Sequence, residues 1–417
     1  METNSSVNGH GSLGRVAPRL LLVICLADIG LRLERVDPLT FRAWEALTTY
    51  RPPGAPFERN RRYYNARSYG DLAAMGNLPA LRQYRPEAFT TDPLGFRNPG
   101  DVASGPVAAI VVGDSFAVGS AVNDDENLTA RLSALMGCRL YNAGGIDPHP
   151  DRILALARQL DLRGNLVIHE YNEDFEMPAV PTERRRRLQR AMAWMNGWVG
   201  GPFGRARGIL TVSPLEILSE QALKKLENGR ILPNQYSGAV VRGRLANGDQ
   251  MLFRRSWVDG SCRKKAVPLA YWKWLQEELE AGGLQLVVVI TPSKYRVYRR
   301  FVVEPRGLPE GAGDYVDRAE AELRAAGIPV INLTATISAS AAQHLKEGSY
   351  LYWRDDVHWN AHGIEVGAAA IHEGLLDHLR CSPPNQPAGA EASDRARAGP
   401  GGQGQEGPVG GRKECRP

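Results

Sequence analysis

Cysteine is scarce in this sequence. Only five cysteines stand in 417 residues, too few and too scattered to define a disulfide framework, at Cys25, Cys138, Cys262, Cys381 and Cys415. Their odd number leaves at least one unpaired within the chain. No Cys-x-x-Cys pair indicates a metal site. We therefore predict chemistry that needs neither a metal nor a cofactor.

Long apolar runs are lacking near the N-terminus. The run Leu20–Leu31 has 12 residues, fewer than the roughly 20 that a spanning helix needs, and Asp28 within it would be costly at a bilayer centre. Extension to Val16–Leu33 adds Arg19 and Arg32, whose long side chains can reach the two interfaces. We predict a signal-peptide core or, because no Ala-x-Ala-like site follows, an uncleaved membrane anchor. The alternative is an amphipathic helix packed on a soluble domain.

A large excess of one charge is absent as well. The formal net charge is +5 and the pI is near 8.9, and part of the excess is local, as in Arg184–Arg187. Such runs are typical of a solvated helix face, and the alternative is attraction to anionic polysaccharide or lipid headgroups. No recognised nucleic-acid-binding module accompanies the charge, so we predict no nucleic-acid partner.

Apolar residues, in contrast, suffice for a large core. With 43% hydrophobic and 23% charged residues the composition is typical of a folded enzyme. We expect a tail and signal-anchor segment at 1–35, a lead-in at 36–104 and a catalytic domain at 105–380 with an insertion at about 181–282. The remaining segment, 381–417, is rich in Gly and Pro and poor in large apolar residues, which predicts disorder.

Strand-like and helix-like patterns alternate along the catalytic domain. Apolar runs predict strands at 108–112, 140–143, 166–169, 284–290 and 329–333, and helical periodicity predicts helices at 126–136, 271–280, 314–326 and 338–347. An Asn-Gly turn at 247–248 predicts a hairpin within the insertion, which would shape the acceptor pocket or form a peripheral lid. The alternation predicts an α/β fold whose parallel sheet has helices on both faces.

The tripeptide Gly113-Asp114-Ser115 follows the first of these strands. Gly113 permits a sharp turn that leaves Ser115 exposed at the carboxyl end of a buried strand, where open α/β sheets place their chemistry. The three residues are also turn formers, so a purely structural strand-ending turn is the alternative.

A serine nucleophile needs a base and an acid that orients the base. The segment Asp355-Asp356-Val357-His358 supplies both residue types. Either carboxylate could orient the His358 imidazole and stabilise its cation. An acidic cluster at the start of the helix that follows is the structural alternative.

Two further strand ends offer donors to an oxyanion. The loop after the strand at 140–143 contains Gly144 and Gly145, whose backbone N–H groups could face it. The strand at 166–169 leads to Asn172, whose side-chain amide could donate to the same oxyanion or cap a turn.

The order of these blocks resembles the SGNH, or GDSL, hydrolase family over roughly residues 105 to 380. The resemblance implies a three-layer α/β/α sandwich, a Ser115 nucleophile and ester chemistry on acylated substrates. It also implies an oxyanion hole made of the Ser115 N–H, a glycine N–H and Asn172. The usual glycine position falls near Asp147, and Glu173 stands between Asn172 and the acid that usually follows directly.

The second half resembles the SGNH-like domains of alginate O-acetyltransferases and related exopolysaccharide-modifying proteins. The segments 287–298 and 350–363, the latter with an Asp-Val-His-Trp-Asn core, carry this resemblance. In those relatives the Gly-Asp-Ser block follows the Asp-x-His-Trp stretch, whereas here it precedes it. Their pattern implies Asp356 as the acid, whereas simple SGNH hydrolases imply Asp355. We favour Asp356.

The lead-in contains the motif Asp92-Pro-Leu-Gly-Phe-Arg-Asn98. It resembles a segment that often precedes the nucleophile strand in membrane-anchored bacterial SGNH proteins. Because its residues favour turns, we predict a structural role in which Phe96 packs under the sheet, and no chemistry.

These patterns predict an enzyme of the cell envelope, anchored in the inner membrane and facing the periplasm, or secreted. It would act on O-acyl esters of a polysaccharide through an acyl-enzyme on Ser115, as an esterase or an O-acetyltransferase. A membrane protein that delivers acyl groups is a possible partner. The alternative is a non-catalytic SGNH-like protein that binds polysaccharide or assists its assembly.

Overall fold

The computed structural model describes residues 10–32, 40–181, 213–228, 237–261, 263, 265–304, 308–309 and 312–376. The run Arg184–Arg187, predicted to lie on a solvated helix face, and the predicted disordered tail at 381–417 lie outside these residues.

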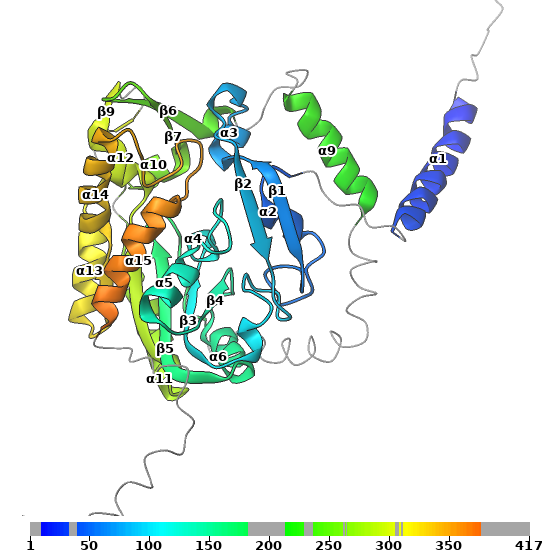
Figure 1. Ribbon diagram of the computed structural model, residues 1–417. Helices are drawn as coiled ribbons and strands as arrows, with labels where there is room; N and C mark the ends of the chain where they lie inside the picture. Colours follow the sequence, from blue (N-terminus) through cyan, green and yellow to red (C-terminus); the bar gives the residue numbers. More distant parts are fainter. Residues whose placement is uncertain are drawn as a thin grey trace, which may run out of the picture. The chain divides into compact units, whose positions relative to one another are not determined.

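A five-stranded sheet organises the chain (Figure 1). Its order is β10-β8-β5-β3-β4, and every neighbouring pair is parallel. The strands are β3 (Val107–Gly113), β4 (Leu140–Gly144), β5 (Leu162–Asn172), β8 (Gln285–Thr291) and β10 (Val330–Asn332). The predicted α/β class with a parallel sheet is confirmed.

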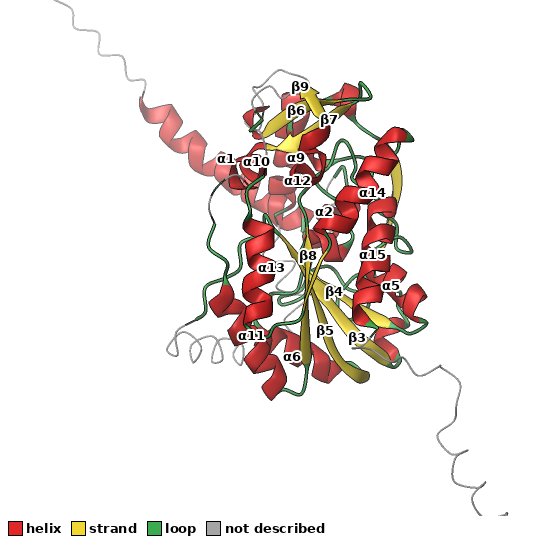
Figure 2. Cartoon of the chain, turned by 90° about the vertical axis from the view of Figure 1, so that its left-hand side faces the viewer, coloured by secondary structure: helices red, strands yellow, loops and turns green. Residues whose placement is uncertain are grey.

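Helices cover both faces of this sheet (Figure 2). Successive strand residues point to opposite faces, so Val111 and Ile110 of β3 belong to different cores. The Val111 side packs against α5 (Leu128–Met136), α14 (Thr334–Lys346) and α15 (Ala361–Leu375). The Ile110 side packs against α6 (Pro150–Gln159), α11 (Leu269–Ala281) and α13 (Tyr315–Ala325). The predicted helices are confirmed, although α14 begins four residues early and α6 was not predicted.

The lead-in folds onto the same unit. It forms α2 (Ala43–Thr48), an antiparallel pair of strands β1 (Arg62–Ser68) and β2 (Arg85–Thr90), and α3 (Asp71–Met75). None of these elements was predicted, because their sequences are short and carry no extended periodicity. Phe96 is buried and packs against Tyr141 of β4 with ring centroids 5.7 Å apart, so its predicted packing role is confirmed.

The insertion adds a small antiparallel sheet. Strands β6 (Val240–Leu245) and β7 (Gln250–Arg254) pair across the Asn247-Gly248 turn, so the predicted hairpin is confirmed. A third strand, β9 (Val302–Glu304), pairs with β6. Two short helices follow β7 and β8, namely α10 (Arg255–Ser261) and α12 (Lys294–Tyr298).

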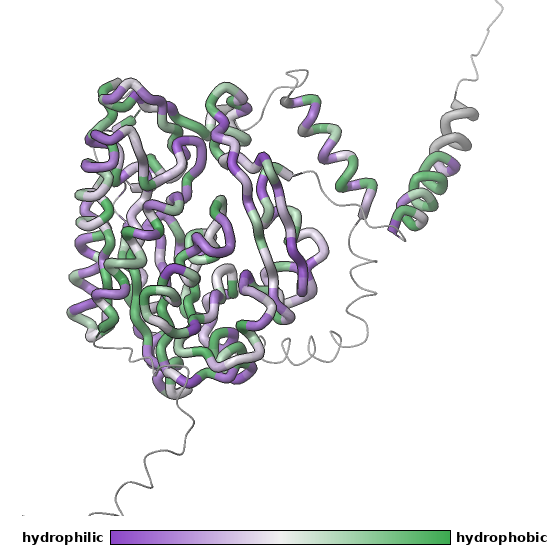
Figure 3. Tube along the Cα trace, viewed as in Figure 1, coloured by the Kyte–Doolittle hydropathy of each residue, from purple (hydrophilic) through white to green (hydrophobic). Residues whose placement is uncertain are grey.

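Two further helices are α1 (His10–Leu31) and α9 (Pro214–Asn228). Figure 3 shows hydrophobic residues along α1, and several of them, including Leu21 and Val23, are exposed. Asp28 accepts a hydrogen bond from the Ser213 hydroxyl at 2.7 Å and pairs with Arg32. Among the described residues, no helix combines the length and apolarity needed to cross a membrane.

Candidate active site

The nucleophile turn is shaped by close packing. A Cβ atom on Gly113 would lie 2.8 Å from the Ala117 Cβ and from the Glu170 carboxylate, and its φ of +153° disfavours other residues. The next residue, Asp114, accepts a hydrogen bond from the Phe116 N–H at 2.8 Å and so caps the short helix α4 (Ser115–Val118). Ser115 therefore lies at the carboxyl end of β3, as predicted, and also begins a short helix, which was not predicted.

The structure brings Ser115, His358 and Asp356 into one chain of hydrogen bonds. The Ser115 Oγ lies 2.7 Å from the His358 Nε2, and the His358 Nδ1 lies 2.6 Å from the Asp356 Oδ1. Both His358 and Asp356 are buried. Burial by itself would raise the pKa of Asp356, but His358 and two neighbouring arginines hold it below its ordinary value. Asp356 is therefore an anion that can stabilise an imidazolium.

Asp355 points elsewhere. Its carboxylate accepts hydrogen bonds from the Gly70 and Gln83 N–H groups, each at 2.8 Å, and from Arg85 at 3.0 Å. A Cβ on Gly70 would overlap the Asp355 backbone, so the lead-in approaches this loop closely. The structure thus places Asp356, and not Asp355, against His358. The prediction of Asp355 as an alternative triad acid is therefore corrected, because its carboxylate binds residues of the lead-in instead.

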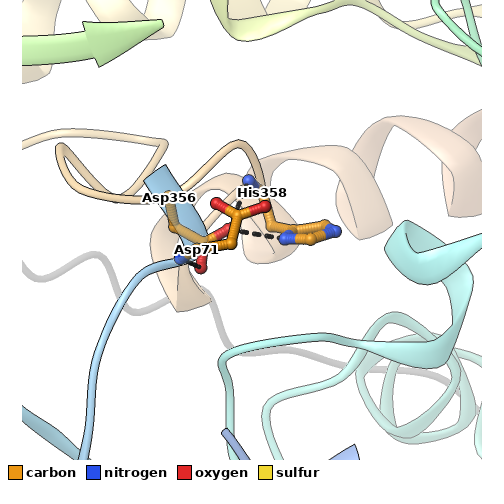
Figure 4. A group of neighbouring side chains, drawn as sticks. All are labelled: Asp71, Asp356 and His358. Atoms are coloured by element: carbon orange, nitrogen blue, oxygen red, sulfur yellow. Dashed lines mark hydrogen bonds and ion pairs between the residues drawn. The ribbon is translucent and has the colours of Figure 1, made fainter. Parts of the chain in front are cut away.

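Asp71 completes the surroundings of Asp356 and was not predicted from the sequence (Figure 4). The Asp71 N–H donates to the Asp356 Oδ2 at 3.0 Å, and the Asp71 carboxylate accepts from the Val357 N–H at 3.1 Å. Burial, reinforced by the charge of Asp356, raises the pKa of Asp71 to about 6. No local signal marks Asp71, since its hydrogen-bond partners in the loop that carries Asp356 lie more than 280 residues away.

Asp71, Asp356 and His358 also meet a distance test for a metal site, because one possible ligand atom of each lies within 4.8 Å of the others. Those atoms already bond within the protein. The His358 Nδ1 is hydrogen-bonded to one Asp356 oxygen, and the other Asp356 oxygen accepts a hydrogen bond from the Asp71 N–H. A metal ion would have to break these bonds, so the arrangement fits proton transfer better than metal binding.

Two of the predicted oxyanion donors remain available. Ser115 is the first residue of α4, so its N–H has no acceptor within the helix. The Asn172 amide donates to the Thr291 carbonyl at a long 3.4 Å, and its second hydrogen has no acceptor among the described residues. Asn172 and Ser115 line the same pocket.

The two glycines are engaged elsewhere. The Gly144 N–H donates to the Asn142 side chain at 2.9 Å, and the Gly145 N–H donates to the Gly113 carbonyl at 2.8 Å. A Cβ on Gly144 would lie 2.4 Å from the Val118 nitrogen, so this glycine permits close packing beside α4. The predicted glycine contribution to the oxyanion hole is therefore not supported by the structure.

Two carboxyl groups lie at the nucleophile turn, those of Asp114 and the buried Glu170, and both residues line the pocket that Ser115 faces. Burial raises the pKa of both groups, and the charge of Asp114 raises that of Glu170 further. A protonated Glu170 carries no negative charge, so it would not repel an oxyanion that forms on a substrate at Ser115.

Ser115 faces a cavity of about 470 Å³. Its lining includes the aromatic residues Trp44, Phe57, Phe175 and Trp257. Charged residues of both signs line it as well, namely two arginines at positions 51 and 254 and four acidic residues at positions 114, 170, 174 and 176. Trp44 comes from the lead-in, and Arg254 and Trp257 come from the predicted insertion. The insertion thus helps to line the pocket, as one of the two predictions for it proposed.

A known protein family matches part of the second half of the chain. Residues 252–400 match the family model of the SGNH hydrolase-like domain of the acetyltransferase AlgX. The predicted resemblance to SGNH-like alginate O-acetyltransferase-type proteins is confirmed. The matched region contains Asp356 and His358, whereas Ser115 lies outside it. The position of Ser115 therefore rests on the geometry of the site.

Curated relatives of this type are the probable alginate O-acetylases AlgJ of Pseudomonas putida and Pseudomonas syringae pv. tomato. The first is 29% identical over 147 residues, or 34% of this chain and 35% of the relative. The second is 28% identical over 141 residues, or 33% and 34%. The alignments span about a third of each relative's length. One solved chain aligns over 66% of this chain and 98% of its own length at 17% identity, with a TM-score of 0.30 that adds no evidence on fold.

Proposed function

We propose that this protein is a serine-dependent O-acyl esterase or O-acetyltransferase that acts on acyl esters of an envelope or extracellular polysaccharide. The observation that carries the proposal is the continuous hydrogen-bonded chain from Ser115 through His358 to Asp356 at the edge of a pocket. The helices on both faces of the parallel sheet support a three-layer α/β/α fold of the SGNH type.

In the first step the Ser115 Oγ attacks the acyl carbonyl while its proton passes to the His358 Nε2. Asp356 stabilises the imidazolium from the Nδ1 side. The carbonyl oxygen, now an anion, accepts hydrogen bonds from the Ser115 N–H and the Asn172 amide. When the intermediate collapses, His358 gives the proton to the departing alcohol and an acyl-enzyme remains on Ser115.

In the second step His358 removes a proton from the acceptor, which attacks the acyl-enzyme. Water as acceptor makes the protein an esterase, and a sugar hydroxyl makes it an O-acetyltransferase. The relatives named as alginate O-acetylases favour transfer to a polysaccharide. The aromatic lining of the pocket suits a sugar ring, which stacks on such side chains.

We place this chemistry in the cell envelope. Cys138 takes part in a disulfide bond, which is typical of proteins in oxidising compartments. The scattered cysteines did not predict it. The N-terminal segment would direct the protein to the envelope as a signal peptide or an anchor, and a membrane protein that delivers acyl groups would be its partner.

Labelling with a fluorophosphonate tests the proposal. The wild type should be labelled on Ser115, Ser115→Ala should not be labelled, and Ser120→Ala should be labelled like the wild type, because Ser120 lines the same pocket without contacting His358. Acetate release measured against acetyl transfer to an oligosaccharide then separates esterase from transferase. An unlabelled wild type that still binds glycan would favour the non-catalytic alternative.

A further inference from the structure

A lysine lies buried beneath the loop that carries the base and the acid. Lys294, the first residue of α12, is 3% exposed and has no role in the chemistry proposed above. Its ammonium group donates to the carbonyl oxygens of residues 353, 354 and 356, at 2.7, 3.0 and 2.8 Å. A lysine ammonium has three N–H donors, so all of them are used, and all are directed at this one loop.

The segment that contains Lys294 fastens the same loop at two further points. The Tyr352 hydroxyl donates to the Pro292 carbonyl at 2.5 Å, and the Leu351 N–H donates to the Tyr298 hydroxyl at 2.8 Å. Residues 292–298 therefore hold residues 351–356 through five hydrogen bonds. Three of these five depend on Lys294.

Burial of an ammonium group is costly unless its hydrogen bonds and charge are satisfied. The three carbonyl groups satisfy the hydrogen bonds, and negative charges balance the positive one. The ionisable groups that face Lys294 come from the catalytic loop, from α3 and from a small cavity that Lys294 also lines, and they are Asp355, Asp356, Arg354, Asp71, Asp174 and Arg254. The cation is thus built into the acidic surroundings of Asp356.

We propose that Lys294 is a positioning residue whose ammonium group fixes the backbone at residues 353–356, so that Asp356 keeps its contact with the imidazole of His358. The inference rests on the proposed function and extends it to a residue that touches neither substrate nor reacting atoms. A displacement of about 1 Å at a reacting group can reduce the rate about 100-fold. Because Lys294 makes three of the hydrogen bonds that hold this loop, loss of its side chain would allow such a displacement of Asp356.

If Lys294 has this role, its protonation state should affect the pH dependence of activity. A neutral amine keeps two N–H donors and gains a lone pair, which would face one of the three carbonyl oxygens. Burial lowers the pKa of Lys294 to about 7, opposed by Asp355, Asp356 and Asp71. The lysine is charged below its pKa and neutral above it, so activity should fall on the alkaline side, well below the ordinary lysine pKa of about 10.4.

The experiment measures fluorophosphonate labelling and ester turnover from pH 5 to 10 for the wild type, Lys294→Met and Lys273→Met. Methionine keeps the length of lysine but none of its donors. We expect Lys294→Met to lose about 100-fold in kcat with KM changed less than threefold, and to lose the alkaline decline. Lys273→Met removes an exposed lysine of α11, outside the catalytic loop and the pocket, and should behave like the wild type.

The outcomes are distinguishable. If the wild type is labelled on Ser115 but Lys294→Met keeps kcat within twofold, the positioning role is wrong and the proposed function stands. If Lys294→Met does not fold, the wild-type profile decides: an alkaline decline below pH 10 supports the role, and its absence overturns it. A wild type that is not labelled on Ser115 overturns both the proposed function and the inference.

Discussion

The nucleophile turn and the catalytic loop at 351–358 are held in different ways. In the turn, the cap on α4 joins Asp114 to Phe116, two residues away. In the loop, Asp356 bonds Asp71 from 285 residues away, and Lys294 holds the backbone from about 60 residues away. The helix cap of the turn is thus a local contact between neighbours in sequence, whereas the hydrogen bonds that hold the loop come from segments that only the folded protein brings together.

The largest effect is expected on catalysis, in variants of the catalytic loop at 351–358. Asp356→Asn should reduce kcat by about 10⁴-fold, because the amide no longer stabilises the imidazolium and disturbs the tautomer of His358. Asp355→Asn is the matched control, since this carboxylate contacts Gly70, Gln83 and Arg85 instead. We expect it to lose less than tenfold in kcat. Equal losses of kcat in the two variants would contradict the assignment of Asp356, rather than Asp355, as the acid that orients His358.

A smaller loss of activity is expected at the end of β5. Asn172→Ala should reduce kcat by about 10²-fold to 10³-fold while KM changes little, because its amide would donate to the oxyanion of the transition state. Asn142→Ala serves as the control, since the Asn142 side chain bonds the Ala117 carbonyl and the Gly144 N–H. A kcat for Asn172→Ala within threefold of the wild type would remove Asn172 from the oxyanion hole.

Close packing around the nucleophile turn predicts a large effect on stability from one methyl group. Gly113→Ala should lower the free energy of unfolding by about 3–5 kcal/mol, because its Cβ would overlap Ala117 and Glu170 at a strained φ. In Gly100→Ala the added methyl group meets nothing within 4 Å, so the change should be within about 0.5 kcal/mol. Urea denaturation of both variants gives the comparison, and equal stabilities would show that the turn tolerates a side chain.

The smallest effect concerns the pH dependence of stability near the loop. The folded-state pKa of Asp71 is raised to about 6, so its contribution to stability is fully present below the unfolded pKa of 3.8 and is lost as pH rises through 6. Asp71→Asn should remove this loss, which a shift of that size limits to about 3 kcal/mol. Denaturation of both proteins between pH 4 and 7 should show the variant gaining relative to the wild type. A constant difference would contradict the raised pKa.

Much of the sheet could be predicted from the sequence, because its strands are continuous apolar runs bounded by turn formers. The strand at 107–113 and the helix at 128–136 are examples in which local pattern and final structure agree. The lead-in could not be predicted in the same way. Its helix α3 has five residues and its strand β1 alternates between exposed and half-buried positions, so neither carries a strong periodic signal.

The candidate site shows the same division. Ser115, His358 and Asn172 were predicted because each follows or closes a recognisable pattern. The sequence favoured Asp356 over Asp355 only through a resemblance, since a step of one residue along a loop changes the partners completely. The predicted oxyanion role of Gly144 and Gly145 is not supported for a related reason. Whether a backbone N–H is free depends on which acceptor packs beside it, and the N–H groups of both glycines have an acceptor.

The sequence by itself determined the α/β class, the strand-ending serine and the presence of a base with adjacent acids, because these depend on residues a few positions apart. Only the tertiary structure decided that Asp356 is the acid that meets His358, and that Asp71 and Lys294 surround it. The reason is physical: hydrogen bonds act over about 3 Å, and the distance along the chain between such partners reaches 286 residues.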